Sequence, residues 1–158
     1  MITGVENIHA NKIMHRDIKC QNIFLKGNSN ACFGDFGLGK MSDVGETIVG
    51  TPVYLSPEII NECKYDCKTD IWSLGVLLYE ICALKLPFTS KVPSADAVKL
   101  KIVQGTFPPL PKEIPEDICK LIGNMLTLDP TQRPSAKQLL GIFFMLKMLR
   151  VQLHDNMG

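Results

Sequence analysis

The run from Ile71 to Leu84 restricts the fold of this chain more than any other feature, because it is apolar almost all round. Only Ser73, Gly75 and Glu80 interrupt it, so a helix built from it would have no face for solvent. The run is shorter than the roughly 20 residues that span a bilayer, and charged residues flank it closely. We therefore expect a buried helix at the axis of a domain, and no membrane-spanning segment.

The size and charge of the chain fit one folded domain. Its 158 residues can bury a sizeable core, and 46% hydrophobic and 21% charged residues are ordinary values for a globular protein. Seventeen Lys+Arg against sixteen Asp+Glu leave a formal net charge of +1, too weak a field to attract nucleic acid or an anionic membrane. We expect neither as a partner.

The six cysteines are scattered, and no secretory signal opens the chain. Cys63 and Cys67 are the closest pair, but no histidine or second cysteine pair stands at zinc-finger spacing. We expect free thiols, no zinc site, and an intracellular, cytoplasmic location.

Shorter patterns predict the elements around the central helix. Ile2, Val5 and Ile8 recur at helical spacing from the first residue. Two apolar runs, residues 22–25 and 31–33, are separated by a segment rich in turn-forming residues. These patterns predict an N-terminal helix followed by a small β-hairpin.

The sequence after the hairpin predicts an irregular segment and three more helices. Glycine and proline without a sustained period indicate an irregular segment over residues 47–58. Amphipathic patterns predict helices over 95–104 and 116–128. Ser135 and Gln138 have the spacing of a capping box, so a last helix should begin there.

Two short polar motifs carry the chemical information, one before the predicted hairpin and one after it. They are His15-Arg16-Asp17-Ile18-Lys19-Cys20-Gln21-Asn22 and Asp35-Phe36-Gly37. Together they resemble the catalytic loop and the metal-binding loop of protein kinases. Five matched identities in the first motif alone would arise by chance at roughly 1 in 10⁶ to 10⁷ per site, so the match is specific.

The resemblance implies a task for each matched residue. Asp17 would orient the substrate hydroxyl and accept its proton, and Lys19 would contact the transferred phosphoryl group. Asn22 and Asp35 would bind magnesium, and Phe24 would lie beneath the adenine ring of ATP. A lysine two positions after the aspartate is similar to the serine/threonine branch of the family.

Other residues in and near the two motifs would have structural or regulatory roles. By the resemblance, His15 and Phe36 would be packing residues of the domain's interior. Thr47 stands where this family carries an activating phosphate, and Arg16 would be the natural partner of that charge. The alternative is that Thr47 is an unmodified loop threonine.

The likeness continues through Gly50-Thr51-Pro52-Val53-Tyr54-Leu55-Ser56-Pro57-Glu58, which would close the activation segment. By family analogy, Thr51 bridges Asp17 and Lys19. Glu58 would form a structural ion pair with Arg133.

Asp70 stands at the start of the apolar run. The resemblance implies that its carboxylate accepts hydrogen bonds from the backbone of the catalytic loop. Without that resemblance, Asp70 would be an ordinary aspartate in the first turn of a helix.

Within the kinase superfamily, the amino-acid sequences of residues 15–25, 54–58 and 77–84 are similar to those of the NIMA-related (NEK) kinases. The likeness covers residues 1–140, which we expect to be a kinase domain truncated at its N-terminus. Residues 141–158 would be a helix end and tail without an assigned role.

A complete kinase also has a small lobe with a glycine-rich loop, a lysine on its third strand and a partner glutamate. No Gly-x-Gly-x-x-Gly precedes His15. The expected fold is therefore α+β, mainly α: the large lobe of a protein kinase-like fold, with a small β-hairpin and with the small lobe missing.

The implied activity is transfer of the γ-phosphoryl group of ATP to serine or threonine hydroxyls of protein substrates, with Mg²⁺, and we expect this chain to be inactive alone. The alternative is a non-catalytic protein-interaction module derived from a truncated kinase. The face around Phe24, Phe36 and Leu38 would then bind the missing lobe or another protein. In-frame sequence upstream of Met1 that encodes a glycine-rich loop would favour the enzyme.

Overall fold

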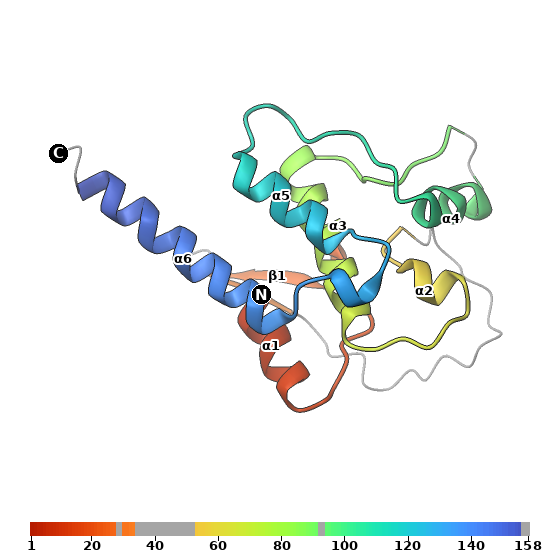
Figure 1. The fold of residues 1–158 in the computed structure, drawn as a ribbon, viewed down its shortest axis with the longest axis horizontal. Coiled ribbons are helices and arrows are strands. Elements are labelled where there is room, and N and C mark those ends of the chain that lie inside the picture. The colour runs from red at the N-terminus through yellow and green to blue at the C-terminus, as the bar shows by residue number, and fades with distance from the viewer. Residues whose placement is uncertain (28–29, 34–52, 92–93, 156–158) are drawn as a thin grey trace.

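The computed structural model describes residues 1–27, 30–33, 53–91 and 94–155 (Figure 1). The fold is mainly helical with one small hairpin, as the sequence predicts. In chain order its elements are α1 (Ile2–Ala10), the 3₁₀ turn η1 (Cys20–Asn22), β1 (Ile23–Lys26), β2 (Asn30–Phe33), α2 (Pro57–Ile60), α3 (Lys68–Ala83), α4 (Ala95–Gln104), α5 (Glu116–Met125), the 3₁₀ turn η2 (Pro130–Gln132) and α6 (Ala136–Asp155). Over the described ranges, no helix is both long and apolar enough to cross a membrane.

Helix α3 runs through the middle of the body, with the other helices arranged around it (Figure 1). It supplies side chains to two hydrophobic clusters on its two sides. Ile71, Leu74 and Leu77 pack into one cluster with residues of α1, α5 and α6. Trp72 and Tyr79 pack into the other, with residues of α4 and α5. A helix that is apolar on both sides is stable here because its side chains are buried in both hydrophobic clusters.

The C-terminal turn of α3 differs from the expectation of a fully buried helix. The helix is buried from Thr69 through Leu77 and at Tyr79, but Ile81 is 49% exposed. Leu84, which was expected to be buried, follows the helix as its cap, with a left-handed φ of 53° and 90% exposure. The last turn lies at the rim of the second cluster, where the neighbouring elements cover only one side of the helix. The apolar composition of the run does not show where this cover ends.

Gly75 lets α5 approach the central helix closely. A Cβ at this position would lie 2.9 Å from the Cβ of Met125 and 3.0 Å from a methyl carbon of Leu126. Real Cβ atoms essentially never lie as close to a neighbour as 2.9 Å, so a larger residue would push the two helices apart. The glycine in the apolar run therefore serves packing.

The hairpin and most of the later helices form as predicted. The strands pair antiparallel, from Ile23 opposite Phe33 to Lys26 opposite Asn30. Helix α4 has the predicted bounds, and α5 ends three residues earlier than predicted, at Met125.

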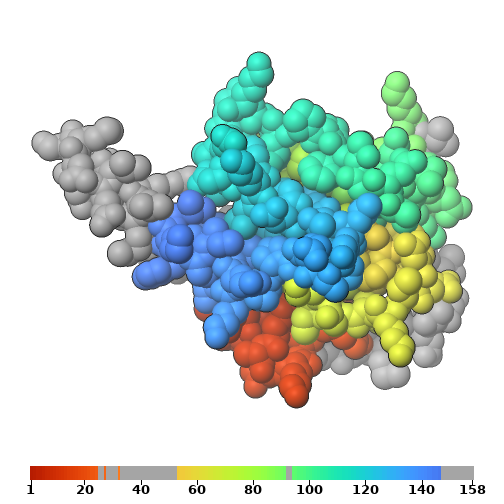
Figure 2. Space-filling view, viewed as in Figure 1, coloured from red at the N-terminus to blue at the C-terminus, as the bar shows by residue number. Residues whose placement is uncertain are grey.

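The beginning of α6 confirms the capping box. The backbone N–H of Ser135 donates to the side chain of Gln138 at 2.8 Å, and the N–H of Gln138 donates to the Ser135 hydroxyl at 3.2 Å. Two of the free donors at the helix start are satisfied in this way. The helix packs beside α1 and extends away from the body to Asp155 (Figure 1), and its first turns lie against the rest of the molecule (Figure 2).

The end of the segment expected to be irregular is a short helix. Pro57 and Glu58 form the first turn of α2, so the expectation for these two residues was wrong. Proline is favourable at this position because the first helical N–H has no partner inside the helix. All six cysteines are free, as predicted.

Candidate active site

The loop of residues 15–22, between α1 and β1, is attached to the central helix by one carboxylate. Asp70, in the first turn of α3, accepts the backbone N–H of His15 at 2.8 Å and that of Arg16 at 2.9 Å. His9 of α1 contacts the same carboxylate at 2.8 Å. Asp70 is 1% exposed, so these bonds compensate the cost of burying its charge.

The backbone of this loop is held in an unusual conformation at Arg16. Its φ of 64° lies in the left-handed region, which costs energy for a residue with a side chain. The two hydrogen bonds to Asp70 come from Arg16 itself and from the residue before it, and they hold this conformation. The strained residue immediately precedes Asp17, which suggests that the strain serves the placement of that side chain.

His15 is buried and acts as a hydrogen-bond acceptor inside the loop. Its Nδ1 accepts the backbone N–H of Asp17 at 3.3 Å. Burial lowers the pKa of His15 below its ordinary value of 6.5, although the charges of Asp70 and Asp17 oppose that change. The ring is therefore neutral at pH 7 and supports the loop by packing and by this bond.

The side chains of Lys19 and Asn22 both contact Asp17. The ammonium of Lys19 lies 2.8 Å from Oδ1 of Asp17. The side-chain amide of Asn22 donates to Oδ2 of Asp17 at 2.7 Å and to its backbone carbonyl at 2.8 Å. The Asp17 side chain is 50% exposed, so its carboxylate remains accessible to a molecule from solvent.

This arrangement can orient a hydroxyl group and stabilise an adjacent anion. A fixed, accessible carboxylate can accept a proton from a hydroxyl within hydrogen-bond reach. The cation of Lys19 lies beside it, where a negatively charged group being transferred would gain electrostatic stabilisation. The side-chain amide nitrogen of Asn22 donates to Asp17. The amide oxygen of Asn22 is a type of ligand that magnesium binds.

The other candidate site residues fall into two groups. Phe24 lies on β1 with 57% of its surface exposed, so an aromatic ring could stack on it. Asp35, Phe36, Thr47 and Thr51 lie outside the described residues. Among the residues that are described, no group of three or more His, Cys, Asp or Glu side chains could hold a metal ion.

Glu58 of α2 and Arg133, which follows η2, form a buried bidentate ion pair. The two guanidinium nitrogens lie 2.7 and 2.8 Å from the two carboxylate oxygens, and the side chains are 7% and 0% exposed. Arg133 also donates to the backbone carbonyls of Thr127, Lys68 and Leu128. These contacts use all five of its N–H donors.

Further contacts complete the surroundings of this ion pair. Thr69 of α3 donates to Glu58 at 2.9 Å, and the guanidinium lies 5.0 Å from the centre of the Trp72 ring. Burial alone would raise the pKa of Glu58, but the hydrogen bonds and charge of Arg133 outweigh it and hold the pKa below its usual value. The pair thus joins α2, α3 and the segment before α6.

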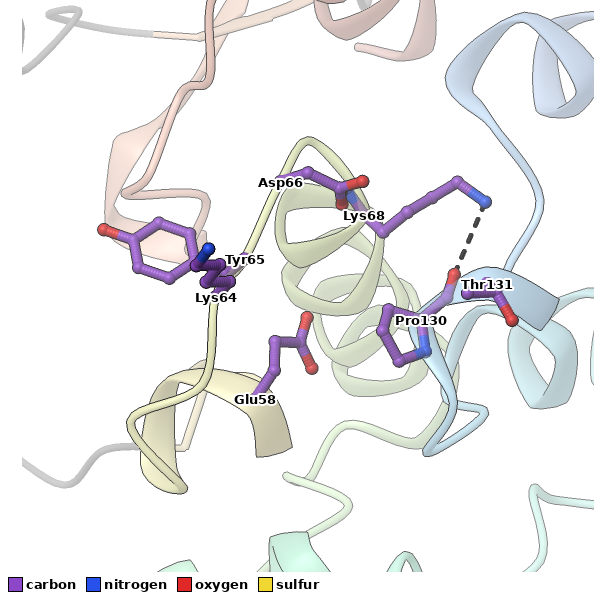
Figure 3. Close-up of a pocket in the computed structure, with 7 residues that line it drawn as sticks. All are labelled: Glu58, Lys64, Tyr65, Asp66, Lys68, Pro130 and Thr131. Atoms are coloured by element: carbon purple, nitrogen blue, oxygen red, sulfur yellow. Dashed lines mark hydrogen bonds between the residues drawn. The ribbon is translucent and has the colours of Figure 1, made fainter.

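A pocket of about 270 Å³ adjoins the ion pair (Figure 3). It lies between α2, the start of α3 and η2. The ammonium of Lys68 crosses its edge to the carbonyls of Pro130, at 3.4 Å, and Arg133. The lining residues are Glu58, Lys64, Tyr65, Asp66, Lys68, Pro130 and Thr131. Asp17, Lys19 and Asn22 do not line this pocket.

The sequence predicted no role for two polar residues, one that contacts the loop and one that contacts Asp70, the residue that anchors it. His9 reaches Asp70 from α1, and Tyr54 accepts the backbone N–H of Cys20 through its hydroxyl at 3.3 Å. Each stands in an apolar local context, so no spacing rule marked it. The only available signal was that a polar atom in such a context needs a partner.

Known proteins resemble this chain over most of its length. Residues 1–145 match the family model described as "Protein kinase domain". The probable serine/threonine-protein kinase nek3 of Dictyostelium discoideum is 43% identical over 158 residues, which cover 95% of this chain and 14% of the relative. Mouse serine/threonine-protein kinase Nek5 is 46% identical over 142 residues, covering 87% and 22%. The putative serine/threonine-protein kinase A of Trypanosoma brucei brucei is 36% identical over 154 residues, covering 94% and 35%.

Proposed function

Because this chain belongs to the protein kinase family, we propose that it provides the large lobe of a Nek-like serine/threonine protein kinase. The reaction would move the γ-phosphoryl group of ATP to a serine or threonine hydroxyl of a protein substrate. The chain spans between about one seventh and about one third of the length of the three relatives described above. The activity, substrates and partners of the whole protein are therefore part of this proposal.

The observation that carries the proposal is the meeting of Lys19 and Asn22 at the accessible carboxylate of Asp17. Phosphoryl transfer depends on positioning and electrostatic stabilisation more than on covalent chemistry of the protein. Asp17 would hold the acceptor hydroxyl and take its proton. Lys19 would stabilise the negative charge of the transferred group, and Thr51 would bridge these two side chains.

The donor set fits magnesium and ATP. Mg²⁺ prefers oxygen ligands, and Asn22 and Asp35 would supply an amide oxygen and a carboxylate. When bound, magnesium would neutralise charge on the phosphates of ATP. The exposed ring of Phe24 would support the adenine, and Phe36 would pack beneath the metal-binding aspartate. His15, Arg16, Glu58, Asp70 and Arg133 would hold the structure around these groups.

The proposal also includes partners and location. We infer that the face around Phe24 binds a small lobe, because 57% exposure of a large aromatic side chain favours a covering partner. The six free cysteines agree with a reducing intracellular, cytoplasmic environment.

A phosphate-transfer assay tests this function in two proteins. One is the 158-residue chain alone, and the other is the same chain preceded by the small lobe, hinge and connecting helix of a Nek relative. We expect the joined protein to phosphorylate casein on serine or threonine and the chain alone to stay at background. Alignment of reacting groups can lower a barrier by about 7–11 kcal/mol, and the small lobe supplies much of that alignment.

Two results would contradict the proposal. A joined protein that is folded and binds ATP but transfers no phosphate would show that the Asp17 site is not catalytic. Transfer by the chain alone at a similar rate would show that the small lobe is unnecessary.

Thr47 provides a separate prediction about regulation. In the joined protein, Thr47→Ala is expected to lower activity several-fold, and Thr47→Asp to retain part of it, because a phosphate here would add about −1.5 to −2 charges for Arg16 to bind. The measurement is kcat after phosphorylation of each variant, with phosphate mapped by mass spectrometry. Equal activity of the alanine variant and the phosphorylated parent would remove Thr47 from the mechanism.

A further inference from the structure

Tyr54 connects the central helix to the loop of residues 15–22 through side-chain contacts for which the resemblance to kinases implied no role. Its hydroxyl donates to the carboxylate of Glu80 on α3 and accepts the backbone N–H of Cys20 at 3.3 Å. Its backbone carbonyl accepts the hydroxyl of Ser73, also on α3, at 2.8 Å. Tyr54 is thus held by α3 at its backbone and at the tip of its side chain, and the tip contacts the loop.

The residues of α3 that make these contacts lie on one side of the helix. Asp70, Ser73 and Glu80 are separated by three and seven residues, which places them within one face of a helix with 3.6 residues per turn. They span about 15 Å along the axis, at 1.5 Å per residue. This polar stripe contacts the loop at two places, directly at His15 and Arg16 and through Tyr54 at Cys20.

Asp17 and Lys19 lie between these two attachment points. Arg16 precedes Asp17 and is bound to Asp70, and Cys20 follows Lys19 and is bound to Tyr54. Asn22, which bonds to Asp17, follows in the same turn, η1. Fixing both ends of so short a segment restricts the backbone from which the two charged side chains project.

Only a group that both donates and accepts can join Glu80 to Cys20. The carboxylate of Glu80 accepts, the backbone N–H of Cys20 donates, and a phenol hydroxyl can do both at once. Burial, followed by the bond to Glu80, raises the pKa of Tyr54 above its ordinary value, so the hydroxyl keeps its proton. Phenylalanine would fill the same space without either bond.

We propose that Tyr54 and Glu80 are positioning residues, which hold the Cys20 end of the loop so that Asp17, Lys19 and Asn22 keep their mutual arrangement. The contacts do not depend on the reaction, but their consequence for catalysis rests on the proposed kinase function. Two measurements therefore separate the structural statement from the catalytic one.

The first measurement is made on the 158-residue chain by ¹H–¹⁵N NMR. Tyr54→Phe is expected to shift the backbone amide signal of Cys20 and the side-chain amide signals of Asn22. The matched control is Tyr79→Phe, which removes a tyrosine hydroxyl on α3 that bonds to the backbone carbonyl of Pro108 at 3.1 Å. The control should leave both signals in place, whereas unchanged signals in Tyr54→Phe would overturn the proposal.

The second measurement is phosphate transfer by the chain joined to a small lobe. Tyr54→Phe is expected to lower kcat about tenfold and to change the KM for ATP less than about twofold, because misplacement near 1 Å can cost up to about 100-fold in rate. Glu80→Leu should do the same, and Glu80→Gln, which keeps an acceptor oxygen, should restore most of the rate.

The double variant Tyr54→Phe/Glu80→Leu distinguishes a shared role from two separate ones. Residues that act through one connection are non-additive, so the double variant should be no slower than either single variant. Additive losses, or an equal loss of kcat in Tyr79→Phe, would overturn the positioning role. A parent without any phosphate transfer would contradict the proposed function, while the NMR shifts would still decide whether Tyr54 holds the loop.

Discussion

Asp17→Asn is expected to reduce kcat for phosphate transfer by about 10²–10⁴-fold in the chain joined to a small lobe, the range that general acid–base catalysis contributes. An amide occupies nearly the same space as the carboxylate but cannot accept the hydroxyl proton. It also loses the charge that pairs with Lys19 at 2.8 Å. The measurement is steady-state transfer of labelled phosphate from ATP to casein.

Asp117→Asn is the matched control for this prediction, because Asp117 is an exposed aspartate in the first turn of α5, away from the site. It makes the same chemical change and should keep the parent's kcat. Both variants should unfold at the parent's urea concentration within error, since the Asp17 side chain is half exposed and Asp117 is exposed. Parent-like turnover by Asp17→Asn would show that another group takes the proton.

Arg133→Met is expected to lower the free energy of unfolding by about 3–5 kcal/mol, the usual cost of leaving one member of a buried ion pair without its partner. The carboxylate of Glu58 would stay buried without the guanidinium that contacts both of its oxygens. Urea denaturation at pH 7 measures the change. Lys120→Met is the control: it breaks an exposed pair with Glu116 and should have no measurable effect.

The same ion pair predicts how the stability of the chain depends on pH. Because the pKa of Glu58 in the folded chain lies below 4.5, the pair stabilises the chain above pH 4.5 and this stabilisation is lost as the pH falls through the folded value. In Arg133→Met, the buried carboxylate favours its protonated form. The deficit of the variant relative to the parent should therefore be larger at pH 7 than at pH 4. A deficit independent of pH would mean that Arg133 stabilises through packing alone.

Sequence patterns predicted those parts of the fold that depend on residues close together in the chain. The capping box at Ser135 depends on two side chains three residues apart, and α4 on the alternation of apolar and polar faces over ten residues. The motif at residues 15–22 likewise places Asp17, Lys19 and Asn22 within one short loop, so their meeting required little information from the rest of the chain.

Features set by distant partners could not be predicted in this way. The bonds of Tyr54 to Cys20 and of His9 to Asp70 join residues 34 and 61 positions apart, and nothing in their immediate sequence indicates the partner. The exposure of Ile81 and Leu84 has a similar origin. Hydrophobic periodicity indicates that a helix is stabilised by burial, but it does not show how far the neighbouring helices extend along it.

The contact between Glu58 and Arg133 also fixes an order of events during synthesis of the chain. The two residues are 75 positions apart, whereas Asp70 and His15 are 55 apart. At synthesis rates of about 5–20 residues per second, Asp70 leaves the ribosome several seconds before Arg133. The loop around Asp17 can therefore be anchored on α3 while Glu58 still lacks its partner. A nascent chain arrested between these points would hold the residues that anchor the loop on α3, while Glu58 would still lack its ion-pair partner.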